Sequence, residues 1–293
     1  MVRFISAFAP AFAAGAAWGM WRPQNTVAEC ATAKSPFTMD EFRAFKLLSC
    51  RYESQDTRRL FFGLESTTTP FVIPVISCVV AKVTDKDGKD VMYPLTPITG
   101  NNKKGHFEVI VKKTAKDKVS SHLFQMRTGD ELLMKGPFQK LAYKPNMWDS
   151  VGMLASSTGV APMYQLLQEI LENPKDKTHA TLIYANNRRE DILLANELKA
   201  MQETYKNFNL YLTLVEAPKR WLGGIGRINE AMIQTFMPKP SDKQFTILVA
   251  GPPEMLAELA GDKVFEEGKR PHQGPLLGLL KEMGYKEDQV FKL

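Results

Sequence analysis

Small and polar side chains gather in three stretches, 156–162, 185–191 and 251–254, and each stretch directly follows a run of apolar residues. Apolar runs of this length are typical of buried strands. In a parallel sheet the loops after the strands meet at one edge, where such sheets bind ligands. The pattern therefore predicts a ligand site of the nucleotide-binding kind. Neither half of the chain carries G-x-G-x-x-G after a first strand, so an ordinary Rossmann dehydrogenase is not supported.

The cysteines, histidines and charged residues argue against a metal site, a disulfide framework and nucleic-acid binding. The three cysteines, Cys30, Cys50 and Cys78, show no C-x-x-C spacing, and the four histidines form no H-E-x-x-H pair. The net charge is +6, but Lys and Arg alternate with Asp and Glu, as in 175–177 and 188–191. This mixture favours a solvated surface in a basic protein over nucleic-acid binding.

The first 28 residues have the composition of a leader. They contain no acidic residue, and Arg3 and Arg22 flank the apolar stretch Phe4 to Trp21. A mitochondrial presequence is acid-poor and basic. A membrane anchor is the other main interpretation, because a helix over this stretch would span roughly 27 Å. A secretory signal fits the rest of the chain poorly. Presequence and anchor stay open, and both can hold together.

The elements that must position the three loops divide the chain in two. With 293 residues and 44% apolar content, the chain suits two domains of ordinary size. Between 36 and 145, short apolar runs recur between turn signals. Expected strands are Leu60 to Leu64, Val72 to Val83, Phe107 to Lys112 and Glu131 to Met134, with Asp87-Gly88 as a hairpin turn. Many short strands at close spacing predict a small antiparallel β barrel.

From 146 to 293, strand and helix patterns alternate. Expected strands are Ser150 to Ala155, Ala180 to Ala185, Leu210 to Val215 and Phe245 to Ala250. Expected helices are Met163 to Leu171 and Ile192 to Met201, the second with Asp191 as its N-cap. The alternation predicts a doubly wound parallel sheet. The chain therefore divides into a leader (1–35), a small β barrel (36–145) and an α/β domain (146–293).

A small β barrel followed by a nucleotide-type α/β domain already suggests a flavin reductase. Eight short strings in the sequence support this suggestion. They are Tyr93-Pro-Leu-Thr-Pro97, Lys104-Gly-His-Phe107, Lys118-Val-Ser-Ser-His-Leu-Phe124, Gly136-Pro137, Thr158-Gly-Val-Ala-Pro162, Asp191-Ile-Leu-Leu194, Gly251-Pro-Pro253, and the tail from Gly284-Tyr285 to Asp288-Gln-Val-Phe-Lys-Leu293. In this order they resemble NADH–cytochrome b5 reductase, within the ferredoxin–NADP reductase superfamily, and most nearly the fungal mitochondrial type. The similarity spans about residues 42 to 293.

The resemblance implies a flavoprotein oxidoreductase. In this family FAD binds in the barrel and NADH on the α/β domain, hydride passes from nicotinamide to the flavin, and electrons leave singly to a haem protein of the cytochrome b5 type. It also implies a mitochondrial location, at the outer membrane, the intermembrane space or the inner membrane, with membrane attachment through the leader.

On the flavin side, the family signature Arg-x-Tyr-Thr/Ser corresponds to Tyr93, Leu95 and Thr96. The resemblance gives Thr96 a catalytic role, as the hydroxyl that hydrogen-bonds near the flavin N5, and leaves Tyr93 without the phosphate-pairing Arg. The second phosphate element, Gly-Lys-Met-Ser/Thr-Ser in the family, corresponds here to Asp117, Lys118, Val119, Ser120 and Ser121. The strand that contains Phe107 and Lys112 corresponds to the family's strand beside the flavin. Alternatively, its residues belong only to the barrel core, which needs no cofactor.

On the nicotinamide side, the family loop Gly-Gly-Thr-Gly-Ile-Thr-Pro corresponds to residues 156–162. Ser156 and Ser157 replace both leading glycines, and the retained positions are Thr158, Gly159 and Pro162.

The remaining nicotinamide-side positions also combine retention with change. Gly226 keeps the family's G-x-G spacing. The family's Cys-Gly-Pro-Pro corresponds to Ala250, Gly251, Pro252 and Pro253. The acid that favours NADH maps to Val215, with Glu216 beside it. Arg188 and Arg189 are candidates for binding a 2′-phosphate, so both coenzymes stay open.

Two functions follow from these correspondences. The first is a working reductase that uses FAD and NADH with altered contacts. The second is a catalytically degenerate reductase fold, kept as a structural subunit or assembly component of a mitochondrial complex. The second is suggested because the changes gather at ligand-facing positions rather than over the surface.

Overall fold

The structure is a computed structural model that describes residues 34–84, 88–101, 103–114, 118–264 and 272–293. Residues 1–33 of the predicted leader and the Asp87 end of the predicted hairpin turn lie outside the described residues. Within those ranges, no helix is both long enough and apolar enough to cross a membrane. The same ranges contain no cluster of three or more His, Cys, Asp or Glu side chains suited to a metal ion.

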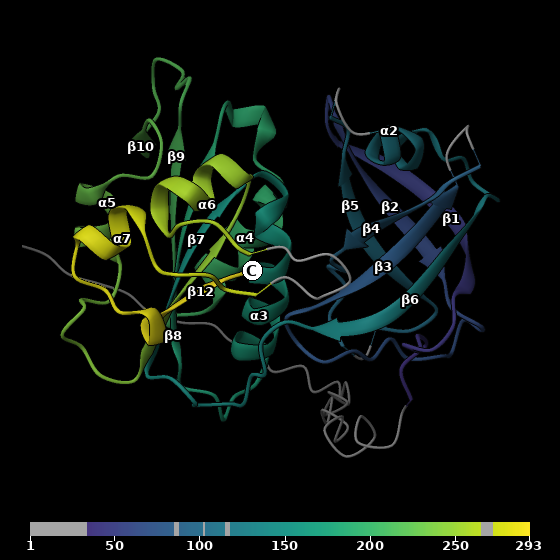
Figure 1. Ribbon diagram of the computed structural model, residues 1–293, viewed down its shortest axis with the longest axis horizontal. Helices are drawn as coiled ribbons and strands as arrows, with labels where there is room; N and C mark the ends of the chain where they lie inside the picture. Colours follow the sequence, from purple (N-terminus) through teal and green to yellow (C-terminus); the bar gives the residue numbers. More distant parts are fainter. Residues whose placement is uncertain (1–33, 85–87, 102, 115–117, 265–271) are drawn as a thin grey trace, which may run out of the picture. The chain divides into compact units, whose positions relative to one another are not determined.

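The first half of the described chain forms a six-stranded antiparallel sheet (Figure 1). Its strands follow the order β4-β3-β6-β1-β2-β5. An antiparallel bridge between Pro97 and Val109 connects the chain after β4 to β5, which joins the two edges of the sheet. The strands are β1 (Arg43–Ser54), β2 (Thr57–Gly63), β3 (Ser77–Thr84), β4 (Asp90–Leu95), β5 (His106–Lys112) and β6 (Glu131–Gln139), and helix α2 (Lys118–Gln125) lies against the end of the barrel beside β5.

Phenylalanine rings form the centre of the barrel core. Phe107 is fully buried and stacks on Phe62 at 5.5 Å and on Phe71 at 5.6 Å between ring centroids. Phe37 and Phe45 meet the same ring edge to face. Because β5 alternates in burial, Phe107, Val109 and Val111 point inward while their neighbours face outward or toward the second domain.

The second half forms a six-stranded parallel sheet in the order β10-β9-β8-β7-β11-β12. Its strands are β7 (Ser150–Ser156), β8 (His179–Asn186), β9 (Phe208–Leu214), β10 (Gly224–Ile225), β11 (Phe245–Ala250) and β12 (Val290–Lys292). The connecting α-helices are α3 (Val160–Glu172), α4 (Ala195–Thr204), α5 (Glu230–Phe236), α6 (Pro253–Leu259) and α7 (Gly278–Glu282), with short 3-10 turns η1 (Ser157–Gly159), η2 (Arg189–Asp191) and η3 (Glu287–Gln289).

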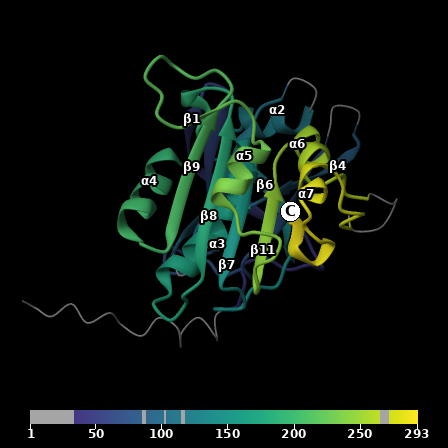
Figure 2. The ribbon, with the colours of Figure 1, turned by 90° about the vertical axis from the view of Figure 1, so that its left-hand side faces the viewer.

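Helices cover both faces of this sheet (Figure 2). The side chains of β7 alternate between them, because Met153 packs with α3 and α4 while Leu154 packs with α5, α6 and α7. A strand buried on both faces is expected to be almost continuously apolar, and β11 is buried at every position with Thr246 as its one polar residue. The predicted fold class, a small antiparallel barrel followed by a doubly wound parallel sheet, is therefore confirmed.

Three local predictions were wrong. Residues 72–76 precede β3 as irregular chain, so the long apolar run is a strand only from Ser77. The loop predicted up to Pro162 ends earlier, because α3 begins at Val160. Asp191 does not cap α4; its carboxylate accepts the Arg188 backbone N–H at 3.1 Å and ends η2, and Leu194, at φ +56°, precedes the helix instead.

Replacing Phe107 should show that the barrel core depends on this ring. Phe107→Ala removes a fully buried ring from a stacked set and should lower the free energy of unfolding by about 3–5 kcal/mol. Phe61→Ala, on the neighbouring strand but only half-buried, is the control and should cost about 1–2 kcal/mol. Denaturant unfolding followed by circular dichroism measures both, and equal losses would contradict the assignment of Phe107 to the core.

Candidate functional site

The carboxyl ends of the parallel strands lie in register and bring the three predicted loops together. Ser156 at the end of β7 pairs with Ala185 of β8, and Ala155 pairs with Ala250 at the end of β11. On the other side, Asn186 pairs with Leu214 of β9. The loops after β7, β8 and β11 therefore meet at one edge of the sheet, as the sequence predicts.

Gly159 is required for the close contact between two of these loops. A Cβ built on Gly159 would lie 2.2 Å from the Ala250 carbonyl oxygen and 2.8 Å from the Gly251 backbone nitrogen. Backbone atoms cannot move aside as a flexible side chain can. Any larger residue would therefore push the turn at 157–159 away from the end of β11. Residues 156–159, 251 and 252, at this edge of the sheet, are partly exposed.

Tyr184 supports the same turn from beneath. Its hydroxyl donates to the Ser157 carbonyl oxygen at 3.0 Å and accepts the Leu193 backbone N–H at 3.3 Å. The side chain is fully buried, and this burial raises the pKa of Tyr184, so the phenol stays protonated and keeps its donor. A buried tyrosine thus connects the loop after β7 to the loop after β8.

On the barrel side, Thr96 is an accessible residue between two buried neighbours. Leu95 and Pro97 are buried, whereas Thr96 between them is half-exposed. Tyr93 is half-buried and packs against the barrel core. The Thr96 hydroxyl is therefore the group of this stretch that is best placed to meet a ligand.

The second phosphate-type element forms the start of α2. Val119 and Ser120 are buried, and the Ser120 hydroxyl accepts the Thr114 backbone N–H at 3.2 Å. The side chain of Lys118 lies outside the described part of the chain. Lys112 forms an ion pair with Asp56 at 3.3 Å. The first turn of α2 contains no acidic residue, so nothing in it opposes an anion at the positive end of the helix dipole.

The two halves of the site meet where the barrel touches α3. Strand β5 contacts the turn η1. The Pro97 carbonyl, directly after Thr96, accepts a hydrogen bond from the side chain of Gln165 at 2.7 Å. The predicted flavin-side stretch and the predicted nicotinamide-side loop therefore approach each other across one interface.

Comparison with known proteins agrees with this two-part site. Residues 44–143 match the oxidoreductase FAD-binding domain family, and residues 153–260 match the oxidoreductase NAD-binding domain family. NADH-cytochrome b5 reductase 2 of Aspergillus niger is 34% identical over 302 residues, covering 98% of this chain and 91% of that protein. The protein of the same name from Mycosarcoma maydis is 38% identical over 260 residues, covering 86% and 73%. The chain belongs to the NADH–cytochrome b5 reductase family.

Solved structures agree with this membership in the NADH–cytochrome b5 reductase family. The cytochrome b5 reductase domain of Ulva prolifera nitrate reductase superposes with a TM-score of 0.75 at 25% identity, covering 89% of this chain and 100% of that domain. The CS-b5R domains of human Ncb5or, in an NAD+ form, superpose with a TM-score of 0.68 at 20% identity, covering 86% and 69%, which supports the fold alone. The family prediction made from the eight strings is confirmed.

This member of the reductase family differs from the family pattern where backbone conformation matters. Ser157 replaces a family glycine and adopts φ +53°, a left-handed conformation that costs a residue with a Cβ about 1–2 kcal/mol. Ser156 replaces the other glycine but is extended, at φ −142°, which any residue adopts. Of the two serine replacements, only Ser157 strains the backbone.

An ion pair connects the loops that follow β8 and β9. Arg188 donates to Glu216 at 2.8 Å, and the Glu216 backbone N–H is bonded to the Asn187 carbonyl. Val215, at the position of the family acid, is 45% exposed. Gly226 has φ +95°, and its carbonyl accepts the Thr213 hydroxyl at 2.7 Å. Leu293, at the place of the family's terminal aromatic, is buried, and its N–H is bonded to the Val249 carbonyl.

The sequence analysis missed three residues that organise the site: Gln165, Tyr184 and Arg59. Arg59 lies on β2 and pairs with Glu108 and with Glu197 of α4, the latter at 2.6 Å. Gln165 and Tyr184 are polar residues inside apolar patterns, which is the signal that could have found them, whereas Arg59 ends the polar stretch before Leu60 and carries no such signal.

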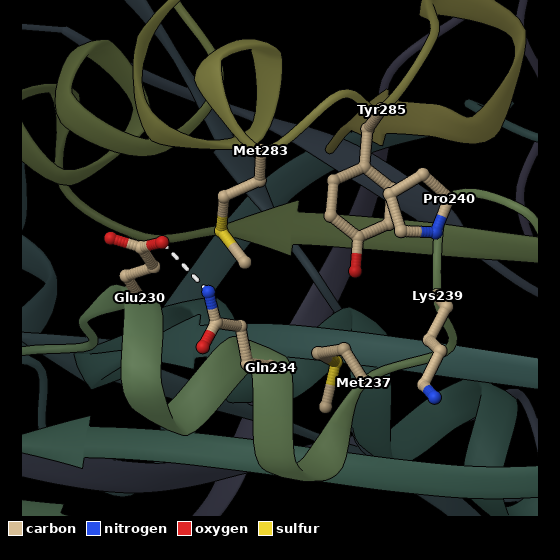
Figure 3. Close-up of a pocket in the computed structure, with 7 residues that line it drawn as sticks. All are labelled: Glu230, Gln234, Met237, Lys239, Pro240, Met283 and Tyr285. Carbon is tan, nitrogen blue, oxygen red and sulfur yellow. Dashed lines mark hydrogen bonds between the residues drawn. The ribbon is translucent and has the colours of Figure 1, made fainter.

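One pocket, of about 330 Å³, lies elsewhere on the α/β domain (Figure 3). It is lined by Glu230, Gln234, Met237, Lys239, Pro240, Met283 and Tyr285. Lys239 and Pro240 precede β11, whereas the site loops follow strands, so the site loops do not form this pocket.

Restoring glycine at position 157 should stabilise the protein. Ser157→Gly relieves the left-handed strain of about 1–2 kcal/mol, partly offset by the extra backbone entropy of glycine, about 0.5–1 kcal/mol. The free energy of unfolding should rise by about 0.5–1 kcal/mol. Ser156→Gly is the matched control. Its free energy of unfolding should fall by about 0.5–1 kcal/mol, because Ser156 has no backbone strain to relieve and glycine adds backbone entropy to the unfolded chain. Urea unfolding measures both variants. A lower free energy of unfolding in Ser157→Gly than in the wild type would contradict backbone strain at Ser157.

Lys263 should make stability depend on pH. Its pKa is lowered to about 8, mainly by burial and then by nearby Lys140. The folded state therefore binds fewer protons than the unfolded chain from pH 8 to the ordinary lysine pKa, and stability rises with pH across that interval. Lys263→Met should remove this part of the rise. Unfolding at pH 7.5 and 9.5 is the measurement, and identical pH slopes in both proteins would refute it.

Proposed function

We propose that this protein is a flavin reductase that takes hydride from NADH and delivers single electrons to a haem protein of the cytochrome b5 type. The observation that carries the proposal is the junction at Pro97 and Gln165, which brings the accessible Thr96 and the turn 157–159 to one interface. The family relationship over nearly the whole chain supports it. Bound FAD would supply the chemistry that converts a hydride into two single-electron transfers.

The residues present fit both cofactors. On the α/β side, the absence of a Cβ at Gly159 lets backbone approach backbone, and the partly exposed edge at 156–159 gives a dinucleotide access to it. On the barrel side, Thr96 would offer a hydroxyl to the flavin ring, and the first turn of α2, which holds no acidic residue and follows Asp117 in the sequence, would face the phosphates. Thr96 therefore orients the flavin, and the glycine loop orients the nicotinamide.

The fit for FAD is weaker than in the family pattern. Tyr93 stands where the resemblance requires an arginine, and a charge-assisted phosphate contact contributes about 1.5–3 kcal/mol. Its loss lowers affinity by roughly one to two decades. Purified protein should therefore lose FAD during dilution and regain it when FAD is added.

NADH is the proposed coenzyme in preference to NADPH. Arg188, a candidate for binding a 2′-phosphate, instead pairs with Glu216. A 2′-phosphate at this end of β9 would meet the Glu216 carboxylate, and two like charges repel. The ribose hydroxyls of NADH can donate to the same carboxylate.

The proposal includes a mitochondrial location, at the outer membrane, the intermembrane space or the inner membrane, with attachment through the leader. Its support is the acid-free composition of residues 1–28. A second candidate is a degenerate reductase fold that serves as a structural subunit of a mitochondrial complex. The specific observation in its favour is the strained Ser157, which shows that a glycine position of the nicotinamide loop has been given up.

An absorbance titration of residues 34–293 with FAD tests the proposed function. We expect flavin bands that shift on binding, bleaching on addition of NADH, slower bleaching with NADPH, and NADH-dependent ferricyanide reduction. Heat-unfolded protein is the control for nonspecific flavin binding. A folded sample that binds no FAD at 100 µM, on the order of one hundred times a typical micromolar affinity, would rule out the reductase and favour the structural subunit.

A further inference from the structure

Gln165 is a buried polar residue on the apolar face of α3. Only 7% of it is exposed. Its Oε1 accepts the Ser77 backbone N–H at 3.0 Å, and its Nε2 donates to the Ser77 carbonyl at 3.1 Å and to the Pro97 carbonyl at 2.7 Å. The side-chain amide therefore bonds to both backbone groups of Ser77, as a neighbouring strand would. It also bonds to the backbone of Pro97. Each of these three bonds satisfies a backbone group that would otherwise be buried at the interface without a hydrogen-bond partner.

These bonds join the two halves of the site directly. Ser77 begins β3, and Pro97 follows Thr96. Gln165 lies on α3, the helix that starts immediately after the turn 157–159. A shift of α3 relative to the barrel would therefore move the nicotinamide-side turn relative to Thr96.

Apolar packing around the amide cannot set this position by itself. Ile76, Ile98 and Ile110 of the barrel belong to the same core cluster as Val160 and Leu167 of α3. Burial of apolar surface is favourable but non-directional, so it tolerates sliding. Hydrogen bonds weaken steeply when their geometry is lost. The isoleucines hold the surfaces together, and the amide selects one register between them.

A second polar connection lies on a different helix. Arg59 of β2 is 8% exposed and pairs with Glu197 of α4, and Glu53 and Glu108 of the barrel also pair with Arg59. A single connection of this kind leaves two bodies free to rotate about it. Two connections, one on α3 and one on α4, restrict that rotation. Without Gln165, α3 can pivot about the Arg59–Glu197 pair while the apolar surfaces stay in contact.

We propose that Gln165 is a positioning residue that sets the distance and angle between the Thr96 stretch and the turn 157–159. This inference rests on the proposed function, because its catalytic consequence is hydride transfer across that interface. Misplacement by about 1 Å can slow a reaction about 100-fold. Gln165 acts through the backbone at Ser77 and Pro97 and does not itself touch the reacting atoms.

Gln165→Met tests this role because methionine fills a similar volume without hydrogen bonding. Gln168→Met is the matched control: Gln168 lies one turn further along α3, and its buried Oε1 has no hydrogen-bond partner. In the FAD-loaded protein we expect Gln165→Met to keep FAD and NADH affinity within about threefold and to slow hydride transfer at least about tenfold in stopped-flow flavin bleaching. Gln168→Met should keep the wild-type rate.

Hydrogen exchange provides a readout that needs no cofactor. In the protein without FAD, the Ser77 amide should exchange at least about tenfold faster in Gln165→Met, while the β7 and β11 amides keep their wild-type rates. Gln165→Glu is a second variant: an ionised carboxylate would face the Ser77 and Pro97 carbonyls without a donor, so hydride transfer should recover as the pH falls and the carboxyl gains a proton.

The outcomes separate the two proposals. Wild-type protein that binds no FAD would defeat the reductase function, while faster Ser77 exchange would still support Gln165 as the residue that fixes the interface. Unchanged hydride transfer in folded Gln165→Met, or unchanged Ser77 exchange, would overturn the positioning role. A lower melting temperature with a normal rate per folded molecule would also overturn it, because it would show a purely structural contribution.

Discussion

Directional hydrogen bonds inside an apolar interface are the interaction on which the whole site depends. The barrel core and one face of the parallel sheet are separate apolar clusters, and the cluster that Ile76, Ile98 and Ile110 of the barrel share with α3 does not by itself fix the placement of one domain on the other. Gln165 supplies that placement through Ser77 and Pro97. Each bond contributes only about 0.5–1.5 kcal/mol net, but leaving its buried partner unsatisfied costs about 1–3 kcal/mol. Other placements of the barrel against α3 would leave these buried groups unsatisfied, and that penalty is larger than the net gain from the bonds in the observed placement.

Among the altered residues, Tyr93, Ser156 and Ser157 are partly exposed, whereas Leu95 and Ala250 are buried. Gly159 and Tyr184 still bring the loops after β7, β8 and β11 together. Ser157 and Tyr93 change what a cofactor would meet. A domain core tolerates few substitutions because it is close-packed, whereas a partly exposed edge tolerates them at the expense of binding. The protein has thus kept the architecture of a flavin reductase, with Tyr93 and Ser157 at positions where the family pattern has an arginine and a glycine.

Strand β5 shows how one element serves both stability and function. Phe107 and Val109 lie in the barrel core, whereas Ile110 packs in the cluster shared with α3, and the strand touches the turn 157–159. The alternation of a strand sends successive side chains to opposite faces. A flavin beside β5 would therefore rest on a strand whose other face is fixed by five packed phenylalanine rings, which gives the site a rigid support.

Local sequence patterns determined much of this protein. The apolar runs Ser150 to Ala155 and Phe245 to Ala250 predicted β7 and β11 closely, and ordered strings identified the family, because strand periodicity and loop composition are local properties. The roles of Gln165, Tyr184 and Arg59, the strain at Ser157, and the true start of α4 were decided only by tertiary structure. A buried polar side chain acquires its role from partners far away in the chain, as Gln165 does from Ser77, and no local pattern encodes that distance.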